Sequence, residues 1–212
     1  MNNSNIYVIA EIGNNHQGSV KHGLELIKAA KDAGANAVKT QKRDNKSLYT
    51  KNFFNQIYDN PNSFGSSYGE HREKLELNKN DYKELIDYAK ELKIDFFATP
   101  FDLKSLEFLE QFNLPSYKIA SADVTNTYLQ AEIAKTKKEI FLSTGGGTLE
   151  DVKRAKENIF NFNENLSILQ CTASYPARLE DMNLRVITTY AKNFPGIRLG
   201  LSDHENGIDA GP

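Results

Sequence analysis

The stretch DFFATPFDLKSLEFLEQFNLPSYKIAS, residues 95–121, holds one strand–helix–strand unit. Its first apolar run ends at Thr99, and Asp102 is suited to cap a short helix that continues through Phe112. A second apolar run then ends at Lys118. Apolar runs separated by a helix and short links are typical of parallel strands joined by crossover helices, so this stretch predicts an α/β fold.

The same unit repeats along the chain. Helical periodicity separates the apolar runs over 20–33, 80–92 and 148–159, and Gly34 is placed to end the first of these helices. The pattern predicts a (β/α)8 TIM barrel, in which the carboxyl ends of all strands face one mouth and their polar residues converge on one pocket of an enzyme. Seven apolar runs carry the pattern: YVIAEIG (7–13), AVKTQ (37–41), DFFATP (95–100), YKIAS (117–121), IFLST (140–144), LSILQC (166–171) and RLGLSDH (198–204).

The predicted barrel is incomplete in this sequence. A (β/α)8 barrel takes about 250 residues, whereas this chain has 212 and ends at Gly211-Pro212 soon after the seventh run. We therefore expect a single barrel domain over 1–212, truncated after about the seventh strand and lacking the eighth β/α unit. Because an open barrel exposes an apolar edge, we expect this segment to be neither stable nor active alone.

A long polar and aromatic segment, 42–78, replaces one short strand-to-helix loop. Loops of this length in compact domains are usually functional lids or inserts. A surface excursion packed by its own aromatic side chains has the same composition, so both interpretations stay open. The aromatic residues are Tyr49, Phe53, Phe54, Tyr58, Phe64 and Tyr68.

Composition excludes several functional classes. The chain is 39% hydrophobic and 25% charged with a formal net charge of -2, and it has neither a long basic run for nucleic acid nor about 18 consecutive apolar residues for a membrane span. The amino terminus lacks the features of a signal peptide, so the expected location is the cytoplasm. The lone Cys171 ends an apolar run and is expected to be a small buried side chain.

Two lysines at the ends of apolar runs indicate an anionic substrate. Lys39 and Lys118 would be costly to bury without an anion, and nearby hydroxyl groups could donate to the same phosphate or carboxylate. A single such lysine can also be a strand-end residue that extends to solvent. The glycine triplet 145–147 could present backbone amides to an anion or be only a turn. The hydroxyl residues are Thr99, Ser121, Ser143 and Ser202.

Acidic and imidazole groups also fall at the predicted mouth. Glu11 could act as a general base or orient water, although a glutamate at this position is often an ion-pair partner. His204 is a candidate metal ligand, with Asp203 as a supporting group and His16 as a second imidazole. A histidine with a purely structural role stays an alternative for each imidazole.

Seven ordered motifs resemble those of the sialic acid synthases, the N-acetylneuraminate synthase family that includes legionaminate and pseudaminate synthases. The resemblance extends from about Tyr7 to Gly211. The motifs are AEIGNNHQGS, GANAVKTQ, FFATPFD, YKIASAD, LSTGGGTLEDV, LQCTASYPA and LGLSDHENGID.

The resemblance implies a condensation of phosphoenolpyruvate with the aldehyde of an open-chain N-acylated hexosamine such as N-acetylmannosamine, with water addition and phosphate release. It implies a divalent metal, Mn²⁺ or Mg²⁺, with His204 as one of two metal-ligating histidines. Glu11 would be the catalytic carboxylate. Phosphoenolpyruvate would be bound by Lys39, Thr99, Lys118, Ser121, Ser143 and Ser202, and the sugar by Gln41, Asp123 and Tyr175.

The chain departs from the family pattern at two positions. Asp123 stands where the best-known bacterial synthases carry glutamate, and Ala173 where some members carry asparagine, with Ser174 beside it as a substitute. In the family, the second metal histidine and a carboxyl-terminal antifreeze-like domain follow the barrel segment seen here. That domain swaps onto the partner subunit, so a homodimer is expected for the full-length form.

Two other functions stay open, together with the identity of the acceptor. Lys39 or Lys118 could form an imine in a Schiff-base aldolase of the same barrel type. The segment could also be an inactive truncated binding remnant. No arginine cluster is evident in the sequence for a second phosphate on the sugar, which favours an unphosphorylated acceptor.

Overall fold

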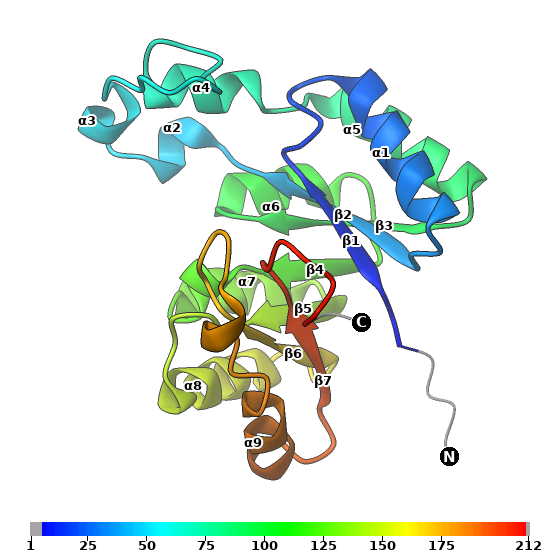
Figure 1. Ribbon diagram of the computed structural model, residues 1–212, viewed down its shortest axis with the longest axis vertical. Helices are drawn as coiled ribbons and strands as arrows, with labels where there is room; N and C mark the ends of the chain where they lie inside the picture. The colour runs from blue at the N-terminus through cyan, green and yellow to red at the C-terminus, as the bar shows by residue number, and fades with distance from the viewer. Residues whose placement is uncertain (1–5, 211–212) are drawn as a thin grey trace. The chain divides into compact units, whose positions relative to one another are not determined.

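A computed structural model describes residues 6–210 and divides into two compact units, with the boundary between Pro115 and Ser116. Strands and helices alternate through both units, as Figure 1 shows. The part of the chain that the structure describes has no helix long and apolar enough to cross a membrane.

The first unit is built on three parallel strands in the order β1, β2, β3. Their bounds are Ile9–Gly13, Ala37–Lys42 and Asp95–Pro100. β2 is the central strand of the three, which explains why Ala37 and Val38 are fully buried. The register sets Glu11 opposite Lys39 and Gln41 opposite Thr99. Because side chains alternate along a strand, these four side chains share one face.

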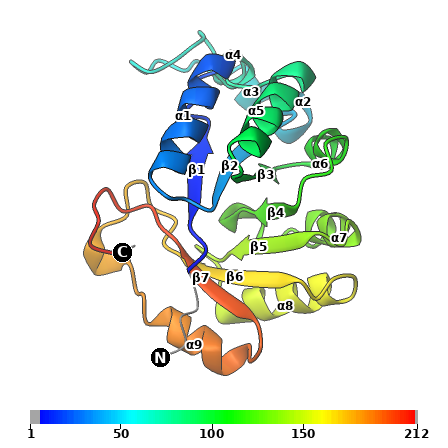
Figure 2. The ribbon, with the colours of Figure 1, turned by 90° about the vertical axis from the view of Figure 1, so that its right-hand side faces the viewer.

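Capped helices cover this sheet. α1 and α5 pack against each other, α1 also contacts β1 and β2, and α5 and α6 contact β3 (Figure 2). Ser19 and Asp102 cap α1 and α6, and Asn78 forms a capping box with Asp81 at α5. The predicted start of α5 at Asn80 was therefore too late, because Asn78 accepts the amide hydrogen bonds. The helices are α1 (Val20–Asp32), α5 (Lys79–Glu91) and α6 (Leu103–Glu110).

The segment 42–78 forms three short helices beyond the carboxyl end of β2 (Figure 1). Tyr68 lies at the centre of their aromatic contacts, with ring centroids 5.2 Å from Tyr49, 4.7 Å from Phe53 and 5.4 Å from Tyr58. The aromatic side chains of the segment therefore pack against one another, and both interpretations of the segment, a functional lid or insert and a surface excursion, stay open. The helices are α2 (Asn45–Leu48), α3 (Lys51–Phe54) and α4 (Tyr68–Lys74).

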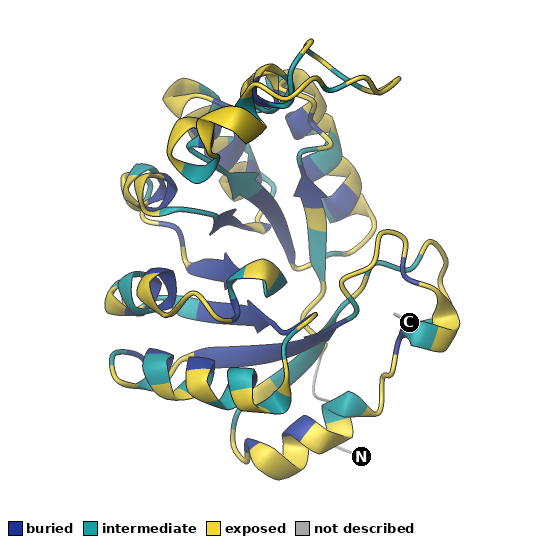
Figure 3. Ribbon diagram, turned by 90° about the vertical axis from the view of Figure 1, so that its left-hand side faces the viewer, coloured by how far each residue is buried: buried dark blue, intermediate teal, exposed yellow. Residues whose placement is uncertain are grey.

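The second unit has four parallel strands in the order β4, β5, β6, β7. Figure 3 shows that β4, β5 and β6 are largely buried, whereas the helices alternate between buried and exposed residues. Such continuous burial matches the uninterrupted apolar runs of the sequence. The strands are β4 (Ser116–Ile119), β5 (Glu139–Ser143), β6 (Leu166–Cys171) and β7 (Arg198–Ser202).

Helices α7 and α8 pack against each other, and α9 contacts β6 and β7. Thr148 caps α8 in a capping box with Asp151, as its sequence position predicts. The helices are α7 (Thr127–Lys135), α8 (Leu149–Phe160) and α9 (Val186–Asn193), with 3-10 turns η1 (Ser121–Asp123) and η2 (Leu179–Asp181).

Candidate active site

The first unit brings Glu11, Lys39 and Thr99 together at the carboxyl ends of its strands. Lys39 is 6% exposed; its Nζ forms an ion pair with the Glu11 carboxylate and donates to Thr99 Oγ1 at 2.8 Å. The Glu11 side chain is 43% exposed, so one side of this pair faces solvent. A buried ammonium held by one carboxylate and one hydroxyl is suited to receive a second, mobile anion.

Gln41 extends this group on the same face. Its Nε2 lies 3.4 Å from Glu11 Oε1. Gly13 ends β1 with a φ of 47°, and a Cβ at this position would lie 3.0 Å from Glu11 Oε1 and 3.3 Å from Gln41 Nε2. The glycine therefore leaves the space that the carboxylate and the amide occupy.

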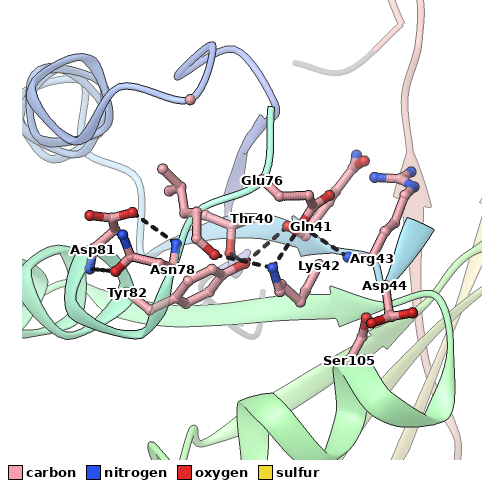
Figure 4. A network of polar contacts seen from close by, with 12 residues as sticks. Thr40, Gln41, Lys42, Arg43, Asp44, Glu76, Asn78, Asp81, Tyr82 and Ser105 are labelled. Atoms are coloured by element: carbon pink, nitrogen blue, oxygen red, sulfur yellow. Dashed lines mark hydrogen bonds and ion pairs between the residues drawn. The ribbon is translucent and has the colours of Figure 1, made fainter. Parts of the chain in front are cut away.

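A buried tyrosine supports the strand that carries Gln41. The Tyr82 hydroxyl donates to the Gln41 carbonyl oxygen at 2.9 Å, and burial raises the pKa of this hydroxyl. Lys42 leaves the strand on the face opposite to the Gln41 side chain, and its Nζ lies 2.8 Å from Glu76 Oε2. Figure 4 draws this ion pair. Sequence inspection did not identify Tyr82 as part of the site, because it has the spacing of an ordinary core residue of α5.

The second unit has its own buried lysine. Lys118 is 7% exposed, contacts the Ser143 hydroxyl and donates to the Ile119 carbonyl oxygen at 3.2 Å. Lys118 on β4 lies opposite Phe141 on β5, so Ser143 lies on the same face two residues further along. This arrangement repeats the lysine–hydroxyl contact of the first unit.

The glycine triplet forms a turn that binds one of the predicted hydroxyl residues, Ser121. The Gly145 amide donates to Ser121 Oγ at 3.0 Å, and the Gly147 amide donates to the Thr144 carbonyl oxygen at 3.1 Å. A Cβ at Gly145 would lie 2.8 Å from the Ala173 Cβ, and Gly146 has a φ of 76°. The triplet is thus required by close packing and by the turn itself.

Ser202 is the last residue of β7, and His204 follows this strand. Ser202 lies opposite Cys171, and the Cys171 thiol is hydrogen bonded to His204 and Ser121. Burial raises the pKa of this thiol, but the two hydrogen bonds outweigh burial and the pKa is lowered overall. The exposed Tyr175 ring lies 4.2 Å from the His204 ring between centroids. The predicted burial of Cys171 is confirmed.

The remaining predicted residues have local partners. Asp123, on η1, accepts from Asn126 Nδ2 at 3.0 Å. His16 is 1% exposed, its Nδ1 accepts from the Gly18 amide at 3.1 Å, and burial lowers the pKa of its imidazole to about 4. His16 therefore has the structural role that was the alternative in the sequence. Ser174 donates to the Pro176 carbonyl oxygen at 3.1 Å.

The described residues do not form a metal site by themselves. Across residues 6–210, no group of three or more histidine, cysteine, aspartate and glutamate side chains could hold a metal ion. His204 supplies one imidazole, whose neighbours are a thiol and a tyrosine ring.

The structure also brings together two arginines that are far apart in sequence. Arg43 follows β2 and Arg72 belongs to α4, yet burial first and the charge of Arg72 second lower the pKa of Arg43. The expectation that no arginine cluster exists was therefore incomplete, because a pair separated by 29 positions (72 − 43) has no local sequence signal.

Comparison with known proteins finds relatives over most of the chain. N-acetylneuraminate-9-phosphate synthase of Mus musculus is 38% identical over 202 residues, which are 95% of this chain and 56% of that protein. N,N'-diacetyllegionaminic acid synthase of Campylobacter jejuni is 35% identical over 95% of this chain and 61% of its own length. The chain thus spans somewhat more than half the length of the curated relatives it matches.

A solved structure gives the fold. The crystal structure of N-acetylneuraminic acid (sialic acid) synthetase from Leptospira borgpetersenii, in complex with citrate, aligns with a TM-score of 0.84 and 29% identity over 96% of this chain and 67% of that one. The predicted α/β fold of TIM-barrel type is confirmed by this match. The model of the NeuB family matches residues 26–211, so the chain belongs to the NeuB family.

Proposed function

We propose that this protein condenses phosphoenolpyruvate with an N-acylated hexosamine and releases phosphate, as a sialic acid or related nonulosonic acid synthase. One observation carries the proposal: in a chain of the NeuB family, each unit holds a buried lysine against a hydroxyl at the carboxyl end of its strands. The proposal is also supported by relatives that are named as synthases of N-acetylneuraminate 9-phosphate and of N,N'-diacetyllegionaminic acid.

In this proposal both lysine groups bind phosphoenolpyruvate. Lys39 and Lys118 neutralise its carboxylate and phosphate, and the hydroxyl groups donate hydrogen bonds that orient the two anions. That the two groups act on one substrate is part of the proposal, and its support is the resemblance of the family motifs that carry them. The hydroxyl groups are those of Thr99, Ser121, Ser143 and Ser202.

The bond changes follow from the substrate. The methylene carbon of phosphoenolpyruvate attacks the sugar aldehyde, which forms the new C–C bond and breaks the C=O π bond. The aldehyde oxygen takes up a proton and becomes a hydroxyl, and a cationic centre is left at the carbon bearing phosphate. Water adds to this carbon, and the C–O bond to phosphate breaks to give the keto acid and inorganic phosphate. Glu11, exposed on one side and held by Lys39, is placed to accept the proton of that water.

The sugar contacts are proposed for three further residues. Gln41 lies beside Glu11, so an amide that binds the sugar here would set the aldehyde near the carboxylate. Asp123 and Tyr175 would contact the sugar from the second unit, where Tyr175 is 74% exposed and open to a ligand.

A divalent metal stays part of the proposal, with His204 as one ligand. Its support is the family resemblance, and such a metal would polarise the sugar aldehyde when bound. A cytoplasmic homodimer of the full-length protein is proposed on the same basis.

The test measures phosphate release from phosphoenolpyruvate with Mn²⁺ and N-acetylmannosamine or its 6-phosphate. Two proteins are compared: the 212-residue chain and the chain expressed to its natural stop codon. We expect release, dependent on the sugar, from the second protein. If it instead forms a borohydride-trapped adduct with pyruvate and needs no metal, the Schiff-base aldolase is correct and the synthase proposal is wrong.

A further inference from the structure

The Arg43 and Arg72 side chains present buried donors without acceptors. Arg43 Nη1 and Arg72 Nε and Nη2 are buried and have no hydrogen-bond partner among the described residues. The side-chain amide of neighbouring Asn45, the first residue of α2, is also buried and has no hydrogen-bond partner among the described residues. Buried guanidinium groups are normally paired, so three unpaired nitrogen atoms in two adjacent arginines indicate an anionic ligand.

The one nearby carboxylate does not neutralise this pair. Glu76 Oε2 accepts from Lys42 Nζ at 2.8 Å and from the Arg43 backbone amide at 3.3 Å, whereas the buried Glu76 Oε1 has no hydrogen-bond partner among the described residues. Lys42, Arg43 and Arg72 together carry three positive charges against the single negative charge of Glu76, so an excess of two remains. A phosphate monoester carries close to two negative charges at neutral pH and matches this excess.

Neighbouring groups hold the arginines in a fixed orientation. The Arg43 guanidinium stacks on the Phe101 ring, 3.6 Å from its centroid. Stacking holds the plane of the fork without engaging its N–H groups, which leaves the unpartnered Arg43 Nη1 available to a phosphate oxygen. Tyr68 is hydrogen bonded to Tyr49 and lies near both arginines. Burial raises the pKa of the Tyr68 hydroxyl, and the charges of Arg72 and Arg43 oppose this rise.

The pair also lies next to a proposed sugar contact. Arg43 is two residues after Gln41, so both side chains leave the strand on the same side, and Lys42 leaves on the other (Figure 4). A ligand that reaches from Gln41 to the arginines therefore has a hydroxyl-bearing part and an anionic end.

We propose that Arg43 and Arg72 form a subsite for the phosphate of a phosphorylated N-acylated hexosamine acceptor. The inference rests on the proposed function and specifies its acceptor. Condensation adds three carbons before C1 of the hexosamine, so a phosphate on C6 of the acceptor becomes a phosphate on C9 of the product. The mouse relative is named for such a 9-phosphate product.

The experiment uses the chain expressed to its natural stop codon, with N-acetylmannosamine and its 6-phosphate as alternative acceptors. We expect wild-type kcat/KM to be at least about tenfold higher for the 6-phosphate, because a charge-assisted hydrogen bond pair contributes about that factor or more. Arg43→Gln and Arg72→Gln should each lower kcat/KM for the 6-phosphate by about 10- to 100-fold. Both should leave kcat/KM for the unphosphorylated sugar and the KM for phosphoenolpyruvate within about twofold.

Arg154→Gln is the matched control, because Arg154 is an exposed residue of α8 paired with Asp151, and it should change none of these values. Arg43→Lys keeps the charge and loses the fork, so a partial loss is expected; this variant replaces Arg43→Gln if the latter does not fold.

Several results overturn the inference. Equal use of both acceptors, or equal losses with both in the variants, assigns the arginines a structural role. A raised KM for phosphoenolpyruvate assigns them to that phosphate. If neither acceptor reacts, the proposed function fails, and calorimetric titration of the 6-phosphate decides the inference separately. Binding that Arg43→Gln weakens at least tenfold supports the subsite, and absence of binding to the wild type refutes it.

Discussion

Replacing Lys39 by methionine separates the cost of burying this ammonium from its use in binding. Lys39 is 6% exposed, and its Nζ contacts the Glu11 carboxylate and the Thr99 hydroxyl. Methionine keeps most of the apolar stem and removes the charge. The Glu11 side chain is 43% exposed, so its carboxylate stays solvated when its partner is lost.

Two opposing contributions set the expected stability of Lys39→Met. Replacing a buried charged group by an apolar one of similar volume is neutral or stabilising by about 1–4 kcal/mol when no buried charge is left behind. Loss of the hydrogen bond to the buried Thr99 hydroxyl opposes this by about 1 kcal/mol. We therefore expect the free energy of unfolding to lie between about 1 kcal/mol lower and about 3 kcal/mol higher than in the wild type.

Binding should change in the opposite direction. A lost charge-assisted hydrogen bond to phosphoenolpyruvate costs about 1.5–3 kcal/mol, which is about 10- to 150-fold in Kd. Urea denaturation followed by circular dichroism gives the stability, and isothermal titration calorimetry gives the affinity, both on the chain expressed to its natural stop codon.

A surface substitution provides the control for Lys39→Met. Lys21 is 86% exposed and lies 4.0 Å from Glu25, so Lys21→Met should change stability by less than about 0.5 kcal/mol and leave phosphoenolpyruvate binding unchanged. The reasoning is refuted if Lys39→Met loses more than about 1 kcal/mol of stability while it binds phosphoenolpyruvate as the wild type does, because Lys39 would then be structural.

Two further predictions test the division of roles and the buried histidine. Lys118→Ala should abolish measurable phosphoenolpyruvate binding, whereas Gln41→Ala should mainly raise the KM for the sugar; equal loss of both ligands in both variants would contradict the assignment. Burial lowers the pKa of His16 from 6.5 to about 4, so the neutral imidazole stabilises the fold above pH 6.5, and this contribution is lost as the pH falls from 6.5 to about 4. The loss should reach about 3 kcal/mol in urea denaturation at pH 4 compared with pH 7. His16→Asn keeps an acceptor for the Gly18 amide and should remove most of this pH dependence, and an undiminished dependence would show that other groups cause it.

Local sequence signals predicted most of the fold because they act over a few residues. Asp102 and Thr148 cap the helices that follow them, and Gly34 follows α1 with a φ of 86°. The start of α5 was missed by one residue because Asn78 and Asn80 are both possible caps in sequence, and only the backbone geometry at Asn78 decides between them.

The lysine groups were predictable because register in a parallel sheet follows from the apolar runs. Once β1, β2 and β3 align, Glu11 lies opposite Lys39 and their side chains point to the same face. The same reasoning brings Lys118 to Ser143 in the second unit. The proposed roles of these residues come from the family motifs. Sequence spacing alone did not distinguish a role in substrate binding or catalysis from simple ion pairing.

The sequence by itself determined the alternation of strands and helices, the helix caps and the polar residues at the strand ends, since each depends on neighbours a few positions away. Only the tertiary structure decided that His16 has a structural partner in its own turn, that Tyr82 holds the Gln41 carbonyl, and that Arg43 meets Arg72. The Arg43–Arg72 contact depends on how the segment 42–78 folds back through its aromatic cluster, and packing between distant segments has no periodic signal in the sequence.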